Sequence, residues 1–249
     1  MALAEAITNI SGVKHDALNK ISFSANWMSS TKTADEKGDL VRGVQALANM
    51  ADSLNVSVPV GKDSLSMKVN WKERQSEHTV TSPMTLNISS FSNVNDLNKS
   101  VTPELSDSDT TLLHLWAHSD KYRLGGSALY QSFKLYGGAT PDIDDANQFK
   151  VLFEATQELL DKDFIEALHD ISDGGLITSL IEMALCSNQG LDINLDYSDK
   201  EQLVPKLFSE EIGLVIEVKN EKLESVRNYL NEKELCFENI AKKLSLIHI

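Results

Sequence analysis

The sequence predicts an α/β or α+β fold, because segments with helical spacing of apolar residues alternate with short apolar segments along the whole chain. The 249 residues are enough for one large domain or two domains of ordinary size. Hydrophobic residues make up 41% and charged residues 24% of the chain, as in ordinary globular proteins, so neither a long disordered segment nor a fibrous structure is expected.

The first part of the chain is expected to contain two helices and four strands. Apolar residues recur at helical spacing over residues 1–11 and again over 39–54. Short or alternating apolar segments predict strands over residues 20–28, 56–60, 65–71 and 83–91. Gly61 is expected to end the second of these strands. Residues 93–109, which are rich in Ser, Asp and Asn, form the best candidate for a domain boundary.

The second part of the chain continues the alternation. Apolar segments predict strands over residues 110–117, 164–169, 191–195 and 212–218. Helical spacing predicts helices over residues 127–136, 144–160, 173–186, 201–208 and 221–231. Acidic residues in the first turn of 144–160 suit the helix macrodipole, and Asn188 with Gly190 forms a helix stop signal.

The charge balance excludes some classes of function. The chain has 23 Lys and Arg residues against 37 Asp and Glu, which gives a net charge of −14. A surface that is so acidic repels phosphate backbones, so broad binding of nucleic acid or of an anionic membrane is not expected. An anionic ligand must then be held locally, by backbone N–H groups, by a metal ion or by one or two cations.

The two cysteines and the hydropathy pattern point to the cytoplasm. Cys186 and Cys236 cannot build a disulfide scaffold or a Cys-based zinc site, and each is expected to be a core residue. No stretch approaches the roughly 20 apolar residues that a membrane span needs. The first residues lack the basic start and the apolar run of a secretory signal.

The strongest local motif is His-Asp-Ile-Ser-Asp-Gly-Gly-Leu, at residues 169–176. It lies where a strand is expected to end and a helix to begin. Free N–H groups at a helix start, next to the flexible Gly174 and Gly175, can bind an anion. Asp170 could face a Mg²⁺ ion carried by that anion, and Ser172 could donate to a phosphate oxygen. The alternative is a plain helix cap by Ser172 or Asp173 that needs no ligand.

Two further segments could contribute polar groups to such a site. Glu5 and Asn9 share one helical face and carry the oxygen ligands that Mg²⁺ prefers, although a solvated helix face would look the same. Residues 59–64, with Gly61, Lys62 and Ser64, resemble the end of a phosphate loop. They fail the Walker A pattern, and an ordinary hairpin turn is the alternative.

The remaining two segments favour structural roles. The sequence Leu-Gly-Gly-Ser at residues 124–127 could form a second anion-binding nest, but a plain turn is favoured. Glu210 and Glu211 have no evident partner in the sequence and are interpreted as a solvated turn.

Five motifs in register resemble one enzyme family. They are residues 5–9 (EAITN), 24–28 (SANWM), 59–67 (PVGKDSLSM), 169–176 (HDISDGGL) and 208–218 (FSEEIGLVIEV). Together they resemble the second half of the synthetase core of phosphoribosylformylglycinamidine synthase, large single-chain type. The resemblance covers almost the whole chain. The fourth motif is shared across the aminoimidazole ribonucleotide (AIR) synthetase superfamily, and the second and third narrow the match.

The resemblance implies an activity and its cofactors. This family uses ATP, Mg²⁺ and glutamine to convert formylglycinamide ribonucleotide (FGAR) into the formylglycinamidine ribonucleotide in purine synthesis. By resemblance, the Mg²⁺ ligands are Glu5, Asn9 and Asp170, and Ser172, Gly174 and Gly175 contact the nucleotide. Such a pocket in large-type members resembles a second nucleotide site without turnover.

The loop at residues 59–64 matches one that approaches ATP and substrate in shorter relatives. Gly61 is therefore expected at the nucleotide. Ser64 and Lys62 are expected at the substrate, although Lys62 stands where relatives have an Asn metal ligand.

The resemblance also implies a domain plan and missing partners. Residues 1–95 would be an AIR-synthetase-like N-terminal domain that forms half of a barrel, and residues 108–249 a C-terminal α/β layered domain. The family's glutaminase domain and first synthetase half have no counterpart here, so the chain is expected to be a fragment that is inactive alone and prone to self-association. The alternatives are another ATP-using synthetase of the superfamily or a catalytically inactive nucleotide-binding module.

Overall fold

A computed structural model describes residues 1–117, 121–195 and 200–244 of the chain. The chain divides into two compact units. The smaller unit contains residues 17–93, and the larger unit contains residues 3–16 and 94–249 together with Met1. None of the helices within the described ranges is long and apolar enough to cross a bilayer.

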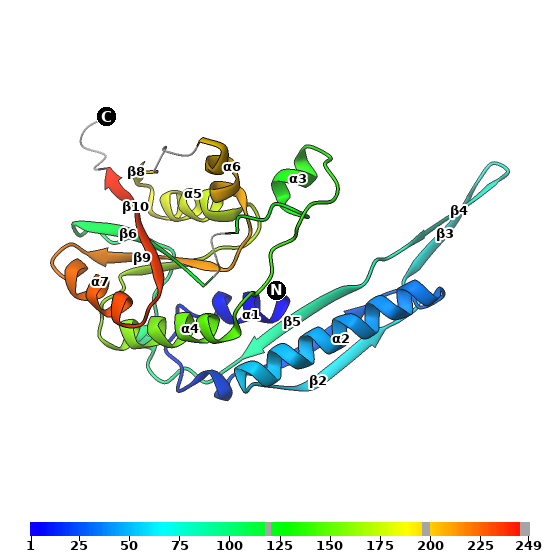
Figure 1. Cartoon of the computed structure of the whole chain (residues 1–249), viewed down its shortest axis with the longest axis horizontal. Helices are drawn as coiled ribbons and strands as arrows, with labels where there is room; N and C mark the ends of the chain where they lie inside the picture. Colours follow the sequence, from blue (N-terminus) through cyan, green and yellow to red (C-terminus); the bar gives the residue numbers. More distant parts are fainter. Residues whose placement is uncertain (118–120, 196–199, 245–249) are drawn as a thin grey trace. The chain divides into compact units, whose positions relative to one another are not determined.

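The smaller unit contains a three-stranded sheet and one long helix (Figure 1). The strand order is β2-β1-β5, in which β1 runs parallel to β2 and antiparallel to β5. Its elements are the short 3-10 helix η1 (Leu18–Lys20), β1 (Ser22–Met28), α2 (Ala34–Leu54), β2 (Ser57–Ser64), β3 (Lys68–Glu73), β4 (Ser76–Thr81) and β5 (Thr85–Phe91).

Helix α2 begins five residues earlier than the apolar spacing predicts, because its start is set by a capping box. The Thr33 hydroxyl accepts a hydrogen bond from the Glu36 N–H at 3.2 Å, and the Glu36 carboxylate accepts one from the Thr33 N–H at 2.9 Å. These polar contacts satisfy orphan donors at the helix start and extend it beyond its apolar stripe. The helix ends at Asn55, which adopts a left-handed conformation.

Strand β2 also differs from the prediction. It continues through Gly61 as far as Ser64, because the parallel partner β1 pairs Gly61 with Ala25 and Lys62 with Asn26. The strand predicted over residues 65–71 is found three residues later as β3, in a two-stranded hairpin with β4 whose residues are nearly all exposed.

Apolar side chains are exposed on several elements of the smaller unit. Val60 on β2 is 57% exposed, Val69 on β3 is 62% exposed and Phe91 on β5 is 60% exposed. The expectation of self-association rests on exposed apolar surface of this kind.

The larger unit is built on a five-stranded sheet with the order β7-β9-β6-β10-β8, in which every neighbouring pair is antiparallel. Helices α4 and α7 lie on one face and α5 on the other (Figure 1). Its elements are α1 (Ala2–Asn9), the 3-10 helix η2 (Leu97–Lys99), β6 (Thr110–Trp116), α3 (Ala128–Ser132), α4 (Ala146–Asp161), β7 (Ala167–Asp170), α5 (Gly175–Ser187), β8 (Gly190–Ile193), α6 (Lys200–Phe208), β9 (Gly213–Lys219), α7 (Leu223–Glu232) and β10 (Cys236–Leu244).

The core of the larger unit follows the alternation of its central strands. Leu112 on β6 and Val215 on β9 are buried in one cluster with Leu176, Leu180 and Met183 of α5. Intervening strand residues face the opposite side, where α4 and α7 pack. Because both faces are covered, β6 and β9 are almost entirely buried, as their apolar segments predict.

The two cysteines are not core residues. Cys186, near the end of α5, and Cys236, at the start of β10, are both exposed. The prediction that they are buried was wrong, because each lies on the outer side of an element whose other side faces the core.

Candidate functional site

A cavity of about 370 Å³ lies in the larger unit, at the end of the sheet where β7 ends and β9 begins. It combines apolar, glycine and acidic residues from segments that are distant in the sequence. The residues that line it are Met1, Glu5, Gly125, Gly126, Thr140, Pro141, Ile171, Ser172, Asp173, Glu210 and Ile212. It therefore brings together the predicted motifs at residues 5–9 and 169–176 and the glycine pair of residues 125–126.

The 169–176 motif folds as predicted into a strand, a tight turn and a helix start. Strand β7 ends at Asp170, and α5 begins at Gly175. The N-cap of α5 is Gly174, which has a φ of +86° and makes no side-chain cap. Neither Ser172 nor Asp173 caps the helix, so the alternative of a plain side-chain cap does not explain this motif.

Acidic side chains gather around Glu5. The pKa of its carboxyl is raised, first by burial and then by the negative charges of Asp173, Asp170 and Glu210. The N-terminal ammonium acts in the opposite direction. Charges that act on one another in this way lie close together, so α1 and the 169–176 turn form one electrostatic site.

Asp170 is held in place by its neighbours. Its side chain is 13% exposed, and one carboxylate oxygen lies 3.4 Å from Nδ1 of His169. The hydroxyl of Ser179 donates to its backbone carbonyl at 2.9 Å. Hydrogen bonding to Asp170 raises the pKa of His169, whose Nε2 lies 3.0 Å from Glu182. Asp170 does not line the cavity, but its charge reaches Glu5.

The oxygen groups near Glu5 fit a hard divalent cation in their chemistry, because carboxylates and amides are the ligands that Mg²⁺ prefers. Asn9 lies one helical turn after Glu5, and both residues are on the exposed side of α1. Within residues 1–117, 121–195 and 200–244, no three His, Cys, Asp or Glu side chains form a metal-binding group. A cation here would thus need the amide of Asn9 or phosphate oxygens as additional ligands.

Glu210 and Glu211 are not a solvated turn, and this interpretation was wrong. The Glu211 side chain is 2% exposed and accepts hydrogen bonds from Nε of Arg123 at 2.5 Å and from its Nη2 at 2.8 Å. Oε1 of Glu210 accepts from the backbone N–H of Gly174 at 2.9 Å and from that of Ala128 at 2.8 Å. Each carboxylate thus links its own segment to one that is distant in the sequence.

The motif at residues 59–64 lies in the smaller unit. It is not a hairpin turn, because residues 57–64 form strand β2. Nζ of Lys62 donates to Oγ of Ser64 at 2.7 Å, and both side chains lie on an exposed part of the strand. The structure therefore places Lys62 and Ser64 together, next to Gly61.

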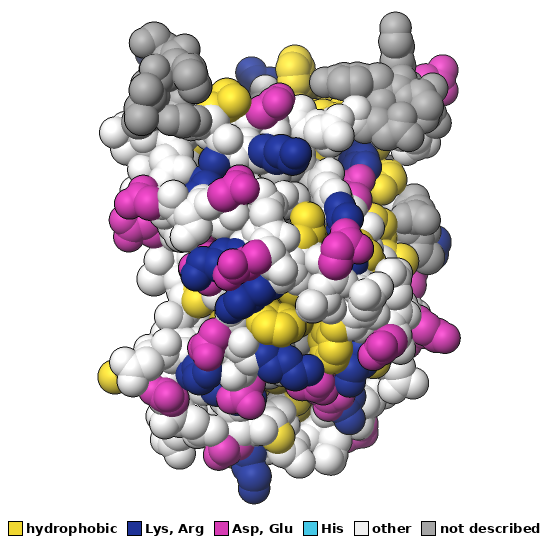
Figure 2. All heavy atoms as spheres, turned by 90° about the vertical axis from the view of Figure 1, so that its left-hand side faces the viewer, with side chains coloured by type: hydrophobic (Ala, Val, Ile, Leu, Met, Phe, Trp, Pro, Cys, Tyr) yellow, Lys and Arg dark blue, Asp and Glu magenta, His cyan; other side chains and the backbone are white. Residues whose placement is uncertain are grey.

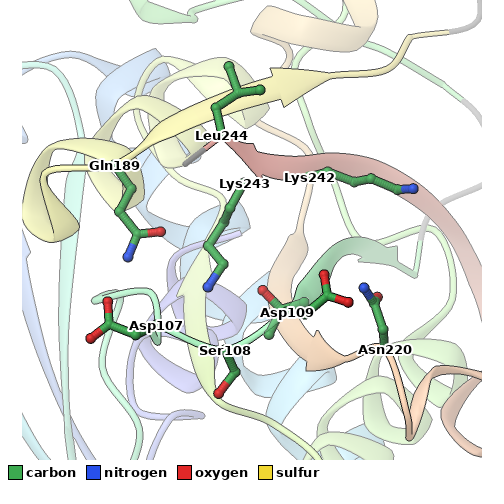
Figure 3. A pocket seen from close by; sticks show the side chains of 9 residues that line it. Asp107, Ser108, Asp109, Gln189, Asn220, Lys242, Lys243 and Leu244 are labelled. Atoms are coloured by element: carbon green, nitrogen blue, oxygen red, sulfur yellow. The ribbon is translucent and has the colours of Figure 1, made fainter. Parts of the chain in front are cut away.

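A second cavity, of about 640 Å³, lies at the opposite end of the larger unit's sheet (Figure 3). Asp107 and Asp109 enter it from the segment before β6, and Lys243 enters from β10 (Figure 3). The ammonium of Lys243 is already paired with Glu217 at 3.1 Å. This cavity contains none of the residues that the sequence motifs single out.

One face of the molecule carries charges of both signs (Figure 2). Figure 2 shows a face on which Lys and Arg side chains are interspersed with Asp and Glu. The described residues drawn there form no continuous basic patch that could follow a phosphate backbone.

Comparison with known proteins defines the family. Residues 1–93 match the FGAR-AT PurM_N-like domain. Residues 117–244, just over half of the chain, match the C-terminal domain of AIR synthase related proteins. The chain belongs to the AIR synthase related family. The predicted fold class, an AIR-synthetase-like N-terminal domain followed by a layered C-terminal α/β domain, is confirmed.

Solved structures share this fold at low sequence identity. T. maritima PurL complexed with ATP is 15% identical with a TM-score of 0.63, and the match covers 98% of this chain and 36% of that one. T. maritima PurL complexed with FGAR is 16% identical with a TM-score of 0.62, and the match covers 98% of this chain and 39% of that one. Thiamine-monophosphate kinase from Stenotrophomonas maltophilia is 14% identical with a TM-score of 0.62, and the match covers 98% of this chain and 74% of that one. The chain thus spans less than two fifths of the length of these PurL chains.

Proposed function

We propose that this chain supplies a Mg²⁺-nucleotide site to an ATP-dependent, glutamine-using synthetase that converts FGAR to the formylglycinamidine ribonucleotide. The observation that supports it best is the gathering of Asp170 and Asp173 around Glu5, across more than 160 residues of sequence. Similar PurL structures contain ATP, a non-hydrolysable analogue, ADP or FGAR, which agrees with a nucleotide and this substrate.

In this proposal, Glu5, Asn9 and Asp170 hold the metal ion, and Ser172, Gly174 and Gly175 lie next to the nucleotide. A bound Mg²⁺ would neutralise part of the polyphosphate charge, which an acidic cavity otherwise repels. Lys62 and Ser64 contact the substrate, and Gly61 lies near the nucleotide at a separate catalytic site.

The proposed enzyme is a cytoplasmic carbon–nitrogen ligase of purine biosynthesis. It would work together with a glutaminase domain and a first synthetase half, so the isolated chain is expected to form no amidine product. Formation of the amidine from FGAR, ATP and ammonia by the chain alone would refute this division of labour.

A second candidate is another ATP-using activity of the same fold. It is favoured by the matches to thiamine-monophosphate kinase and to E. coli HypE, of which this chain covers 74% and 73%. FGAR binding separates the two candidates. A substrate site that includes Ser64 predicts that FGAR binds and that Ser64→Ala weakens binding, whereas the second candidate predicts no FGAR binding.

The variant Asp170→Asn is expected to weaken binding of MgADP at least tenfold, because an amide replaces a charged oxygen ligand near the metal. Isothermal titration calorimetry of the whole chain measures this change. The matched control is Asp192→Asn, which removes the same charge from an exposed position on β8 and should leave affinity unchanged. Equal affinities for MgADP in wild type and Asp170→Asn would contradict the proposed metal site.

A further inference from the structure

The helix start that should attract a phosphate is already occupied by a side chain of the protein. Helix α5 has Gly174 as its N-cap and no side-chain cap, and a free N–H at such a position favours an anion. Here that N–H donates to Oε1 of Glu210 at 2.9 Å, and the same oxygen accepts from the N–H of Ala128 at 2.8 Å. A carboxylate thus takes the place of the anionic ligand.

Glu210 also connects the two glycine loops that line the cavity. Ala128 directly follows the loop with Gly125 and Gly126, and Gly174 belongs to the turn between β7 and α5. Both loops and Glu210 border the same cavity of about 370 Å³. A phosphate group that used the N–H groups of Gly174 and Ala128 would therefore have to displace Glu210.

The charges around the cavity make such a displacement unfavourable for a free polyanion. Three carboxylates, those of Glu5, Asp173 and Glu210, line the cavity, and none of the described lining residues is Lys, Arg or His. The ammonium of Met1, which also lines the cavity, offsets part of this negative charge. Arg123 is close in sequence to the glycine loop, but its guanidinium is paired with Glu211 and Asp144. A cation carried by the ligand would reverse this balance, because the cation, and not the phosphate, would then lie next to the carboxylates.

We infer that Glu210 is a specificity-determining residue: it occupies the backbone N–H groups of Gly174 and Ala128 as a resident anion, so that the cavity accepts metal-complexed polyphosphates and rejects metal-free ones. The inference rests on the proposed nucleotide function of this cavity. It adds that the protein's own side chain closes the helix start to phosphate, and that the ligand binds to the cavity through its metal ion.

The variant Glu210→Ala tests this inference, because it removes the oxygen that occupies the N–H groups of Gly174 and Ala128. Metal-free pyrophosphate, titrated in the presence of EDTA, is expected to bind the variant at least tenfold more tightly than wild type in calorimetry. Mg-pyrophosphate is expected to bind both proteins within about threefold, since the other carboxylates remain.

Glu5→Ala is the matched control, since it removes an equal charge from the same cavity and leaves the Glu210 hydrogen bonds to the two N–H groups in place. It should gain much less affinity for metal-free pyrophosphate than Glu210→Ala. A similar gain in both variants would mean that total charge, and not occupation of the N–H groups, sets the selectivity, and would overturn the inference. If Glu210→Ala does not fold, Glu210→Gln is titrated in its place, with a smaller gain expected because its amide oxygen still accepts from the N–H groups.

Two measurements on the wild-type chain also test the inference and the proposed function. Equal affinities for metal-free and magnesium-complexed pyrophosphate in wild type would overturn the inference without any variant. Failure of wild type to bind MgADP would refute the proposed function instead. The inference would then be judged by whether Glu210→Ala gains metal-free pyrophosphate binding: a gain supports it, and no gain overturns it.

Discussion

Replacement of Glu217 by alanine is expected to lower the free energy of unfolding of the larger unit by about 3–5 kcal/mol, the range found when one partner of a buried ion pair is removed. The Glu217 side chain is fully buried on β9, and its carboxylate lies 3.1 Å from Nζ of Lys243, whose side chain is 10% exposed. The carboxylate also accepts hydrogen bonds from the Ser106 N–H at 2.9 Å and the Thr110 hydroxyl at 2.7 Å.

Alanine at position 217 would leave the Lys243 ammonium without its counter-ion, although that group still donates to the Ser106 carbonyl, and would leave two donors without their acceptor. Water reaches this place poorly, and this accounts for the size of the effect. Urea unfolding followed by far-ultraviolet circular dichroism measures the loss. Glu217→Gln keeps an acceptor oxygen and should lose less than Glu217→Ala.

The double variant Glu217→Leu/Lys243→Met is a stronger control. It removes both charges together and should recover the part of the stability that is lost through the unpaired charge, because a buried pair replaced by apolar residues often costs little. The cost of the unpaired Ser106 N–H and Thr110 hydroxyl should remain. A loss below about 1 kcal/mol in Glu217→Ala would show that the pair does not hold the segment before β6 against the sheet.

Elements that bury one side or both sides in a regular way were predictable from the sequence. The strands at residues 110–117 and 212–218 and the helix at 144–160 are observed within two residues of their predicted bounds as β6, β9 and α4. Their apolar residues recur with the period of the element, and that period is a local property of the chain.

Features that depend on distant partners were not predictable in this way. Gly61 lies inside β2 because a parallel neighbour pairs with it, and the sequence around Gly61 does not contain that neighbour. Helix α2 starts early because Thr33 and Glu36 exchange hydrogen bonds. The capping-box spacing was present in the sequence, but it lay outside the apolar stripe on which the prediction relied.

The candidate site also combines features that local spacing predicts with features that depend on distant residues. The strand–turn–helix at residues 169–176 and the shared helical face of Glu5 and Asn9 follow from local spacing. The roles of Glu210 and Arg123 do not, because Glu210 binds the N–H of Gly174, 36 residues away, and Arg123 pairs with Glu211, 88 residues away. The one local signal for them was an acidic pair between two apolar segments, which is also typical of an exposed turn.

The second large effect is expected at Gly175, the first residue of α5. Its φ is +74°, and a Cβ added there would lie 2.7 Å from the carbonyl oxygens of Leu207 and Ser209. These are backbone atoms, which cannot rotate away as a side chain can. Gly175→Ala is therefore expected to lose about 1–2 kcal/mol through the left-handed backbone and about 1–3 kcal/mol more through the clash.

Gly126→Ala separates these two contributions. Gly126 has a similar φ of +78°, but a Cβ added there meets no atom within 4 Å. It should show the backbone cost alone, so the difference in free energy of unfolding between the two variants measures the clash. Because residues 207–209 lead directly into Glu210, the clash should also displace that carboxylate from Gly174, and Gly175→Ala should bind metal-free pyrophosphate more tightly than wild type. Equal losses of stability in the two variants would mean that the segment before β9 adjusts freely, and the close packing of Gly175 against it would then not fix the position of Glu210.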